Sequence, residues 1–113
     1  MVRGEICLAK FPLGGRGGTK TRPALLLTDP IGSVPELLTA YLSSVIPSTL
    51  LPSDIVLDPG QPQHAATNLK ARSVLRLHKL ATVHLRDIVR KLGVLSAATM
   101  TEVDSRLRTL LKL

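Results

Sequence analysis

The sequence has almost no aromatic residues and a single cysteine. Only Phe11 and Tyr41 are aromatic among 113 residues. Modules that bind single-stranded nucleic acid generally stack bases on aromatic side chains, so a conventional stacking platform is excluded. Cys7 has no partner for an internal disulfide, which suits a reducing compartment. Its place in an apolar alternation favours a buried thiol over a catalytic thiolate.

Long apolar runs are also missing. No segment approaches the length of a membrane span, and no signal-peptide pattern is present. We therefore expect a cytoplasmic protein that makes no membrane contact. A length of 113 residues with 44% hydrophobic content predicts one globular domain over residues 1–113.

Basic residues are absent from the middle of the chain. All fifteen Lys and Arg lie outside the interval from Pro23 to Leu69, although the net charge is +7. Such segregation favours an anionic partner, and nucleic acid is the usual candidate for a small domain. The charge alone leaves a second interpretation equally open, namely a solvated basic surface that maintains solubility.

Glycine and positive charge are densest in "GGRGGTKTRP", residues 14–23. A nucleotide-binding P-loop requires lysine directly after its last glycine, and here Thr19 separates Gly18 from Lys20. The apolar segments on either side instead favour a β-hairpin. We expect residues 14–18 to form its mobile tip, charged by Arg16, and residues 20–23 to begin the next strand.

The hydrophobic pattern predicts a mainly antiparallel β structure. Strands are expected over residues 5–11, 23–28, 37–46, 53–58 and 73–82, and a long polar loop over residues 59–68. The continuous apolar character of residues 23–28 indicates burial on both faces or a dimer contact.

Two helices are expected to follow the strands. Apolar residues at helical spacing predict a helix over residues 84–93, capped by Gly93. Ser96 is the expected N-cap of a last helix, with Leu95 and Met100 as a hydrophobic staple. One apolar stripe of that helix must pack on the sheet or on a second subunit: Met100, Val103, Leu107, Leu110 and Leu111. The fold class is therefore mainly β with a C-terminal helix, as a small β-barrel or strongly curved sheet.

Five blocks of the sequence resemble the MazF/PemK-type toxins of bacterial type II toxin–antitoxin systems, in order and in spacing. They are "RGEICLAKFPLGG", "KTRPALLLT", "YLSSVIPSTLLPSDIVLD", "SVLRLHKLAT" and "RKLGVLS". The resemblance implies a small SH3-like (PemK-like) β-barrel, a homodimer and cleavage of single-stranded RNA without a metal or other cofactor. It also implies inhibition by a cognate antitoxin.

Metal-free RNA cleavage needs cationic donors for the charge that develops on the phosphate as the 2′-OH attacks. Arginine offers a fixed fork of donors that suits phosphate. Arg22 is held beside Pro23 at the start of a buried strand, and the resemblance makes the arginine of this pair a principal catalytic residue. Arg22 is therefore the first catalytic candidate.

Ser43 and Ser44 interrupt an apolar strand. The residues alone favour a strand end whose hydroxyls bond nearby backbone. The resemblance implies instead that Ser43 touches the scissile phosphate, with serine in place of the commoner threonine. Val45 stands where the family commonly has a polar glutamine, a departure that bears on substrate preference.

Arg76 and His78 share one face of an expected strand and complete the catalytic candidates. Taken singly, Arg76 reads as a surface charge and His78 as a partly buried imidazole. The family often has aspartate where His78 stands, and a histidine can accept a proton near neutral pH. We further expect RNA contacts from Arg16, Lys20, Thr21 and Ser44. No histidine spacing indicates a metal site.

Two other functions remain open at this point. A related barrel fold is used by toxins that bind DNA gyrase and cleave nothing, and a non-catalytic barrel that binds nucleic acid or only an antitoxin is also consistent with the charge. The final segment "RLRTLLKL" lacks the aromatic anchor expected at a gyrase-binding surface.

Overall fold

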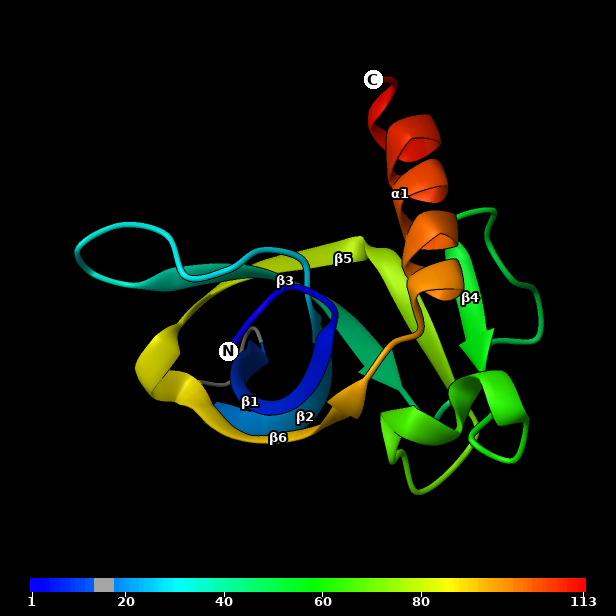
Figure 1. Ribbon diagram of the computed structural model, residues 1–113, viewed down its shortest axis with the longest axis horizontal. Helices are drawn as coiled ribbons and strands as arrows, with labels where there is room; N and C mark the ends of the chain where they lie inside the picture. Colours follow the sequence, from blue (N-terminus) through cyan, green and yellow to red (C-terminus); the bar gives the residue numbers. More distant parts are fainter. Residues whose placement is uncertain (14–17) are drawn as a thin grey trace.

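The computed structural model describes residues 1–13 and 18–113. Within these residues, six strands form one antiparallel sheet with the order β4-β5-β3-β2-β1-β6 (Figure 1). The strands are β1 (Glu5–Leu13), β2 (Gly18–Leu26), β3 (Glu36–Ser43), β4 (Asp54–Leu57), β5 (Ser73–His84) and β6 (Ile88–Val94), and α1 (Ala97–Leu111) follows them. The expected mainly β fold with a C-terminal helix is confirmed.

The sheet is strongly curved, and an irregularity in its longest strand contributes to the bend. Ala40 of β3 pairs with Leu80 of β5, but the next residue, Tyr41, pairs with Arg76. The residues of β5 between these two pairs have no counterpart on β3, and such bulges bend and twist a strand. Figure 1 shows a bend in β5 between its start beside β4 and its far end.

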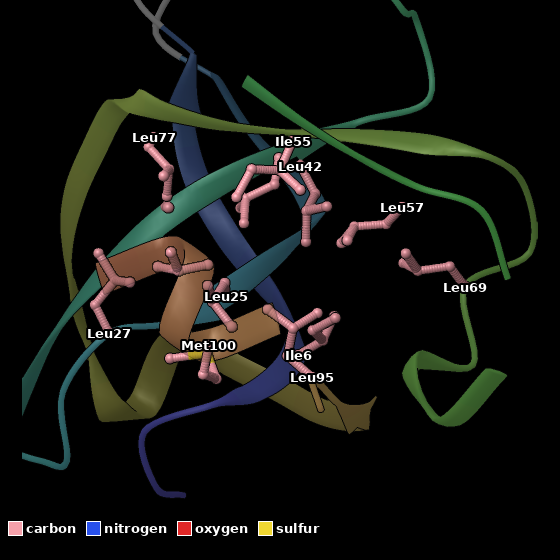
Figure 2. Close-up of a cluster of buried hydrophobic side chains, with 13 residues drawn as sticks. Ile6, Leu25, Leu27, Leu42, Ile55, Leu57, Leu69, Leu77, Leu95 and Met100 are labelled. Atoms are coloured by element: carbon pink, nitrogen blue, oxygen red, sulfur yellow. The ribbon is translucent and has the colours of Figure 1, made fainter. Parts of the chain in front are cut away.

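The largest apolar cluster lies where the sheet meets α1 and β4 (Figure 2). Ile6, Leu25 and Leu42 come from the strands, and Met100 and Val103 come from the helix. Burying one such side chain stabilises the fold by roughly 1.5–3 kcal/mol. Two smaller clusters, around Phe11 and around Leu26, lie on the other face of the sheet. Strand β2 contributes to clusters on both faces, which confirms the burial expected for residues 23–28.

The helix expected over residues 84–93 is wrong. The chain forms a short 3-10 turn, η2 (Leu85–Asp87), and then strand β6, which pairs with β1. Gly93 lies inside β6, where a Cβ atom would come within 2.1 Å of the Ala66 carbonyl oxygen. The glycine therefore permits close contact with the segment that precedes β5 and does not cap a helix.

The sequence predicts a polar loop over that segment, residues 59–68. Within it the structure has a 3-10 helix, η1 (Pro62–Thr67), that buries His64 and Thr67. Asn68 follows with φ of 54° and donates from its side chain to the carbonyl of Leu92 at 2.8 Å. This bond and the close approach at Gly93 fix η1 against β6.

The C-terminal helix begins as the sequence predicts. The Ser96 hydroxyl accepts a hydrogen bond from the Thr99 amide at 3.2 Å, and Leu95 and Met100 are both buried in the main cluster. The apolar stripe of α1 is buried at the start of the helix and exposed at its end. Met100 and Val103 are buried, whereas Leu110 and Leu111 at the far end are exposed.

Candidate functional site

A groove of 780 Å³ opens where β2 and β3 separate. The two strands pair at only three positions, and the last pair is Ala24 with Tyr41. Beyond it, β3 continues beside β5 alone, so the start of β2 and the end of β3 form opposite walls of the groove. Its lining residues are Leu8, Thr21, Arg22, Pro23, Tyr41, Leu42, Ser43, Ser44, Val45, Asn68, Leu69, Lys70, Ala71, Ser73, Arg90 and Leu92.

Arg22 is the cation on the β2 wall. It is half-buried, and its Nη1 donates to the carbonyl oxygen of Thr21 at 3.2 Å. Pro23 has a fixed φ and restricts the preceding residue to extended backbone, which limits the directions open to Arg22. In the described part of the chain no carboxylate forms an ion pair with it. The guanidinium therefore retains donors for an anion.

Ser43 and Ser44 lie on the β3 wall, facing the same groove as Arg22. The Ser43 hydroxyl accepts from the Val45 amide at 3.1 Å and lies 3.4 Å from the Val45 carbonyl oxygen. This is the local backbone bonding that the residues alone suggest for a strand end. The side chain of Val45 is 79% exposed beside it. The hydroxyl thus ends β3 and still borders the groove.

The structure places Arg76 and His78 elsewhere. Neither lines the groove, and both approach the side chain of Asp54, which is fully buried. Arg76 donates to Asp54 through Nε at 3.1 Å and Nη2 at 3.2 Å, and His78 Nδ1 lies 4.0 Å from the same carboxylate. The four expected catalytic residues therefore fall into two separate pairs.

The carboxylate of Asp54 is held in its charged form despite its burial. Burial alone would raise its pKa, but hydrogen bonds from the Leu51 amide and from Arg76 outweigh that effect and lower it. The backbone of Asp54 is fixed as well, because its carbonyl accepts from Arg106 of α1 at 3.0 Å. Arg76 thus belongs to a buried network that joins β4, β5 and α1.

Two of the four residues expected to bind RNA line the groove. Thr21 and Ser44 line the groove, whereas Lys20 is exposed on β2 outside the lining. Arg16 and residues 14–17 of the expected hairpin tip (residues 14–18) lie outside the described residues, and Gly18, the last residue of that tip, belongs to β2. Strand β2 begins at Gly18, somewhat earlier than the sequence suggests.

Sequence reasoning missed two cations of the groove. Lys70 follows η1, and Arg90 lies on β6, the segment that was expected to be a helix. Both belong to the basic cluster that begins after Leu69, which was the available signal. Their convergence on Arg22 depends on the pairing of β6 with β1, which no local pattern encodes.

Other side chains with reactive potential are structural. Cys7 is a buried free thiol in contact with Met1, and burial raises its pKa. Residues 1–13 and 18–113 contain no cluster of three or more His, Cys, Asp or Glu side chains with metal-binding geometry. None of the helices in that part of the chain has the length and apolarity needed to span a membrane.

The curved sheet and its basic groove define a small β protein equipped to bind an anion. A family model described as the PemK-like, MazF-like toxin of type II toxin–antitoxin systems matches residues 2–111, and the chain belongs to this family. A comparison with curated proteins finds no match.

Solved structures show the same fold at low sequence identity. The Mycobacterium tuberculosis toxin MazF-mt6 is 20% identical, with a TM-score of 0.72 over 96% of this chain and 97% of that one. An endoribonuclease in complex with its cognate antitoxin, from a mycobacterial species, is 17% identical, with a TM-score of 0.71 over 100% and 96%. A chain of the MazE-MazF structure (Form-III) from Deinococcus radiodurans is 18% identical, with a TM-score of 0.72 over 100% and 97%.

Proposed function

We propose that this toxin-family protein is an endoribonuclease that cleaves single-stranded RNA without a metal ion. The observation that carries the proposal is the groove in which Arg22 faces Ser43 and Ser44, because it joins hydroxyl groups to a cation that no described carboxylate pairs with. One similar structure is described as an endoribonuclease, which agrees with this activity.

RNA cleavage by 2′-oxygen attack gives Arg22 and Ser43 distinct roles. The 2′-hydroxyl of a ribose gives up its proton to water as its oxygen attacks the adjacent phosphorus. The new O–P bond closes a cyclic phosphate, the bond from phosphorus to the 5′-oxygen breaks, and the departing 5′-oxygen takes a proton from water. Arg22 donates to the non-bridging oxygens as their negative charge increases, which is the interaction that accelerates such a step. Ser43 donates a further hydrogen bond to the same phosphate. The proposal gives Arg76 and His78 no contact with it.

Cleavage in the presence of a chelator tests this function. The purified protein is incubated with several single-stranded RNAs in EDTA, and the new ends are mapped. We expect cleavage at defined positions that leaves a cyclic phosphate on one fragment and a 5′-hydroxyl on the other. Cleavage that requires added metal, or intact RNA across all sequences, would reject the mechanism. Retention of gyrase together with intact RNA would favour the gyrase-binding alternative.

We also propose a cognate antitoxin and a second copy of this chain as partners in the cytoplasm. The structures from the mycobacterial species and from Deinococcus radiodurans are toxin–antitoxin complexes by description, which supports the first partner. Exposed apolar side chains support a protein contact: Val45, Leu50, Leu51, Leu110, Leu111 and Leu113. Sedimentation at micromolar concentration tests the homodimer, and a monomer there would contradict it.

A further inference from the structure

Beyond Arg22, the lining of the groove contains two more cations. Arg90 of β6 and Lys70, which follows η1, both line it and are both exposed. No acidic side chain is found in the lining among the residues that the structure describes. The site therefore carries three positive charges and no compensating carboxylate, which favours a ligand with more than one negative charge.

The register of the sheet sets the spacing between Arg22 and Arg90. Leu8 of β1 pairs with Pro23 on one side and with Arg90 on the other. The backbones at Pro23 and Arg90 are therefore two strand spacings apart, roughly 10 Å. Arg22 immediately precedes Pro23. A short piece of single-stranded RNA can span this interval, with one phosphate at each end.

A comparison along β6 shows that Arg90 differs from its neighbour. Lys91 forms an ion pair with Glu5, with its Nζ 2.8 Å from the carboxylate. Neither Arg90 nor Lys70 forms an ion pair with any described residue. Between Arg22 and Arg90 lies Leu8 of β1, a half-buried residue of the groove lining whose aliphatic surface cannot satisfy a charge but can contact a base.

We propose that Arg90 and Lys70 form a second phosphate-binding point, two β-strand spacings from the reacting phosphate at Arg22. This inference rests on the proposed RNA-cleaving function and specifies how the substrate lies in the groove. One phosphate is held by Arg22 and Ser43, and a neighbouring phosphate of the same strand is held by Arg90 and Lys70. The base between them lies against the side chain of Leu8.

The salt dependence of RNA binding tests the second phosphate-binding point. The probe is a short single-stranded RNA made with 2′-O-methyl groups, which cannot be cleaved by 2′-oxygen attack. The logarithm of its dissociation constant is measured against the logarithm of salt concentration. Loss of one contact to single-stranded RNA reduces this slope by about 0.7. We expect that reduction for R90Q and for K70Q, and an affinity about three- to tenfold weaker at low salt.

Two further variants separate charge from folding. R90K keeps the charge and is expected to retain the wild-type slope, and R108Q removes an exposed charge of α1 outside the groove and is expected to do the same. Thermal melting verifies that all variants fold. Wild-type slopes for both R90Q and K70Q would overturn the proposal, as would an equal reduction for R108Q. Failure of the nuclease function appears separately, as intact unmodified RNA with the wild-type protein.

Discussion

Arg22 and Arg76 lie on strands of one sheet but in opposite electrostatic surroundings. Arg22 borders an open groove, and the one hydrogen bond that its guanidinium makes to a described residue is to the neighbouring Thr21 carbonyl. Arg76 donates twice to the buried carboxylate of Asp54, which is tied through its backbone to Arg106. The first guanidinium has donors available for a ligand, and the second directs two of its donors to a carboxylate inside the protein. Residue type alone does not distinguish a binding arginine from a structural one.

The largest expected effect comes from the groove. Arg22→Ala should lower the rate of RNA cleavage by about 100- to 1,000-fold, because it removes the donor for the developing phosphate charge. The free energy of unfolding should change by less than about 0.5 kcal/mol, since Arg22 has no ion-pair partner in the described chain. Cleavage assays and denaturant unfolding measure the two quantities.

Arg108→Ala is the matched control, since this arginine is exposed on α1 away from the groove. It should leave both quantities unchanged. A variant at Arg22 that cleaves at the wild-type rate would remove this residue from the reaction.

The opposite profile is expected at Arg76. Arg76→Ala leaves the Asp54 carboxylate buried without its partner, and such losses cost about 3–5 kcal/mol of stability. The folded fraction should cleave RNA at close to the wild-type rate. Arg3 provides the control, because its pair with Asp104 is exposed. Arg3→Ala should cost less than about 1 kcal/mol.

Denaturant unfolding and cleavage assays, both started at a temperature where the variants are folded, decide whether Arg76 is structural or contacts substrate. If Arg76→Ala were as stable as the wild type but cleaved RNA as poorly as Arg22→Ala, the comparison between the two arginines would be reversed, and Arg76 would contact substrate.

Acid should weaken the buried network before it affects the groove. The pKa of Asp54 is lowered in the folded protein, as is that of Glu5, chiefly through its hydrogen bond with Lys91. A lowered pKa stabilises the fold above the unfolded value of about 4, and this stabilisation is lost as the pH falls through the folded pKa. The free energy of unfolding should therefore be nearly constant from neutral pH to about pH 5 and decline below about pH 4.

Asp54→Asn sharpens the test. The variant should be less stable than the wild type at neutral pH, and the difference should shrink as acid protonates the wild-type carboxylate. A difference that stays constant between neutral pH and pH 3 would show that the charge of Asp54 does not stabilise the fold. Arginine retains its charge throughout this range, so the groove cations do not contribute to the change.

The sequence predicts those parts of the molecule that depend on local patterns. Alternating apolar residues indicate the strands, and the Ser96 cap with its Leu95 and Met100 staple marks the start of α1. The prediction of a helix over residues 84–93 fails because the apolar spacing of this segment also fits a short turn followed by an edge strand. Gly93 is required there by carbonyl groups of η1, a contact between segments that are distant in sequence.

The candidate site shows the same limit. The position of Arg22 before Pro23, together with the family resemblance, makes it a candidate, but the sequence does not identify the partner of Arg76. Asp54 and Arg76 are 22 residues apart and meet because β4 and β5 pair in a register that sets them opposite each other. Arg90 enters the groove only because β6 pairs with β1. The register of strand pairing thus decides which cations remain available.

The smallest expected effect tests whether Ser43 belongs to the groove or only to the strand end. Ser43→Ala removes a hydroxyl that bonds the Val45 amide, so it should cost about 0.5–1.5 kcal/mol of stability. If the hydroxyl also donates to the phosphate, cleavage by the folded protein should fall a further fivefold or so, the value of one hydrogen bond. Ser43→Thr keeps the hydroxyl and should restore both quantities, while the exposed Ser48→Ala should alter neither. Stability lost without any loss of cleavage would confine Ser43 to ending β3 and leave Arg22 as the only described side chain assigned to the reacting phosphate.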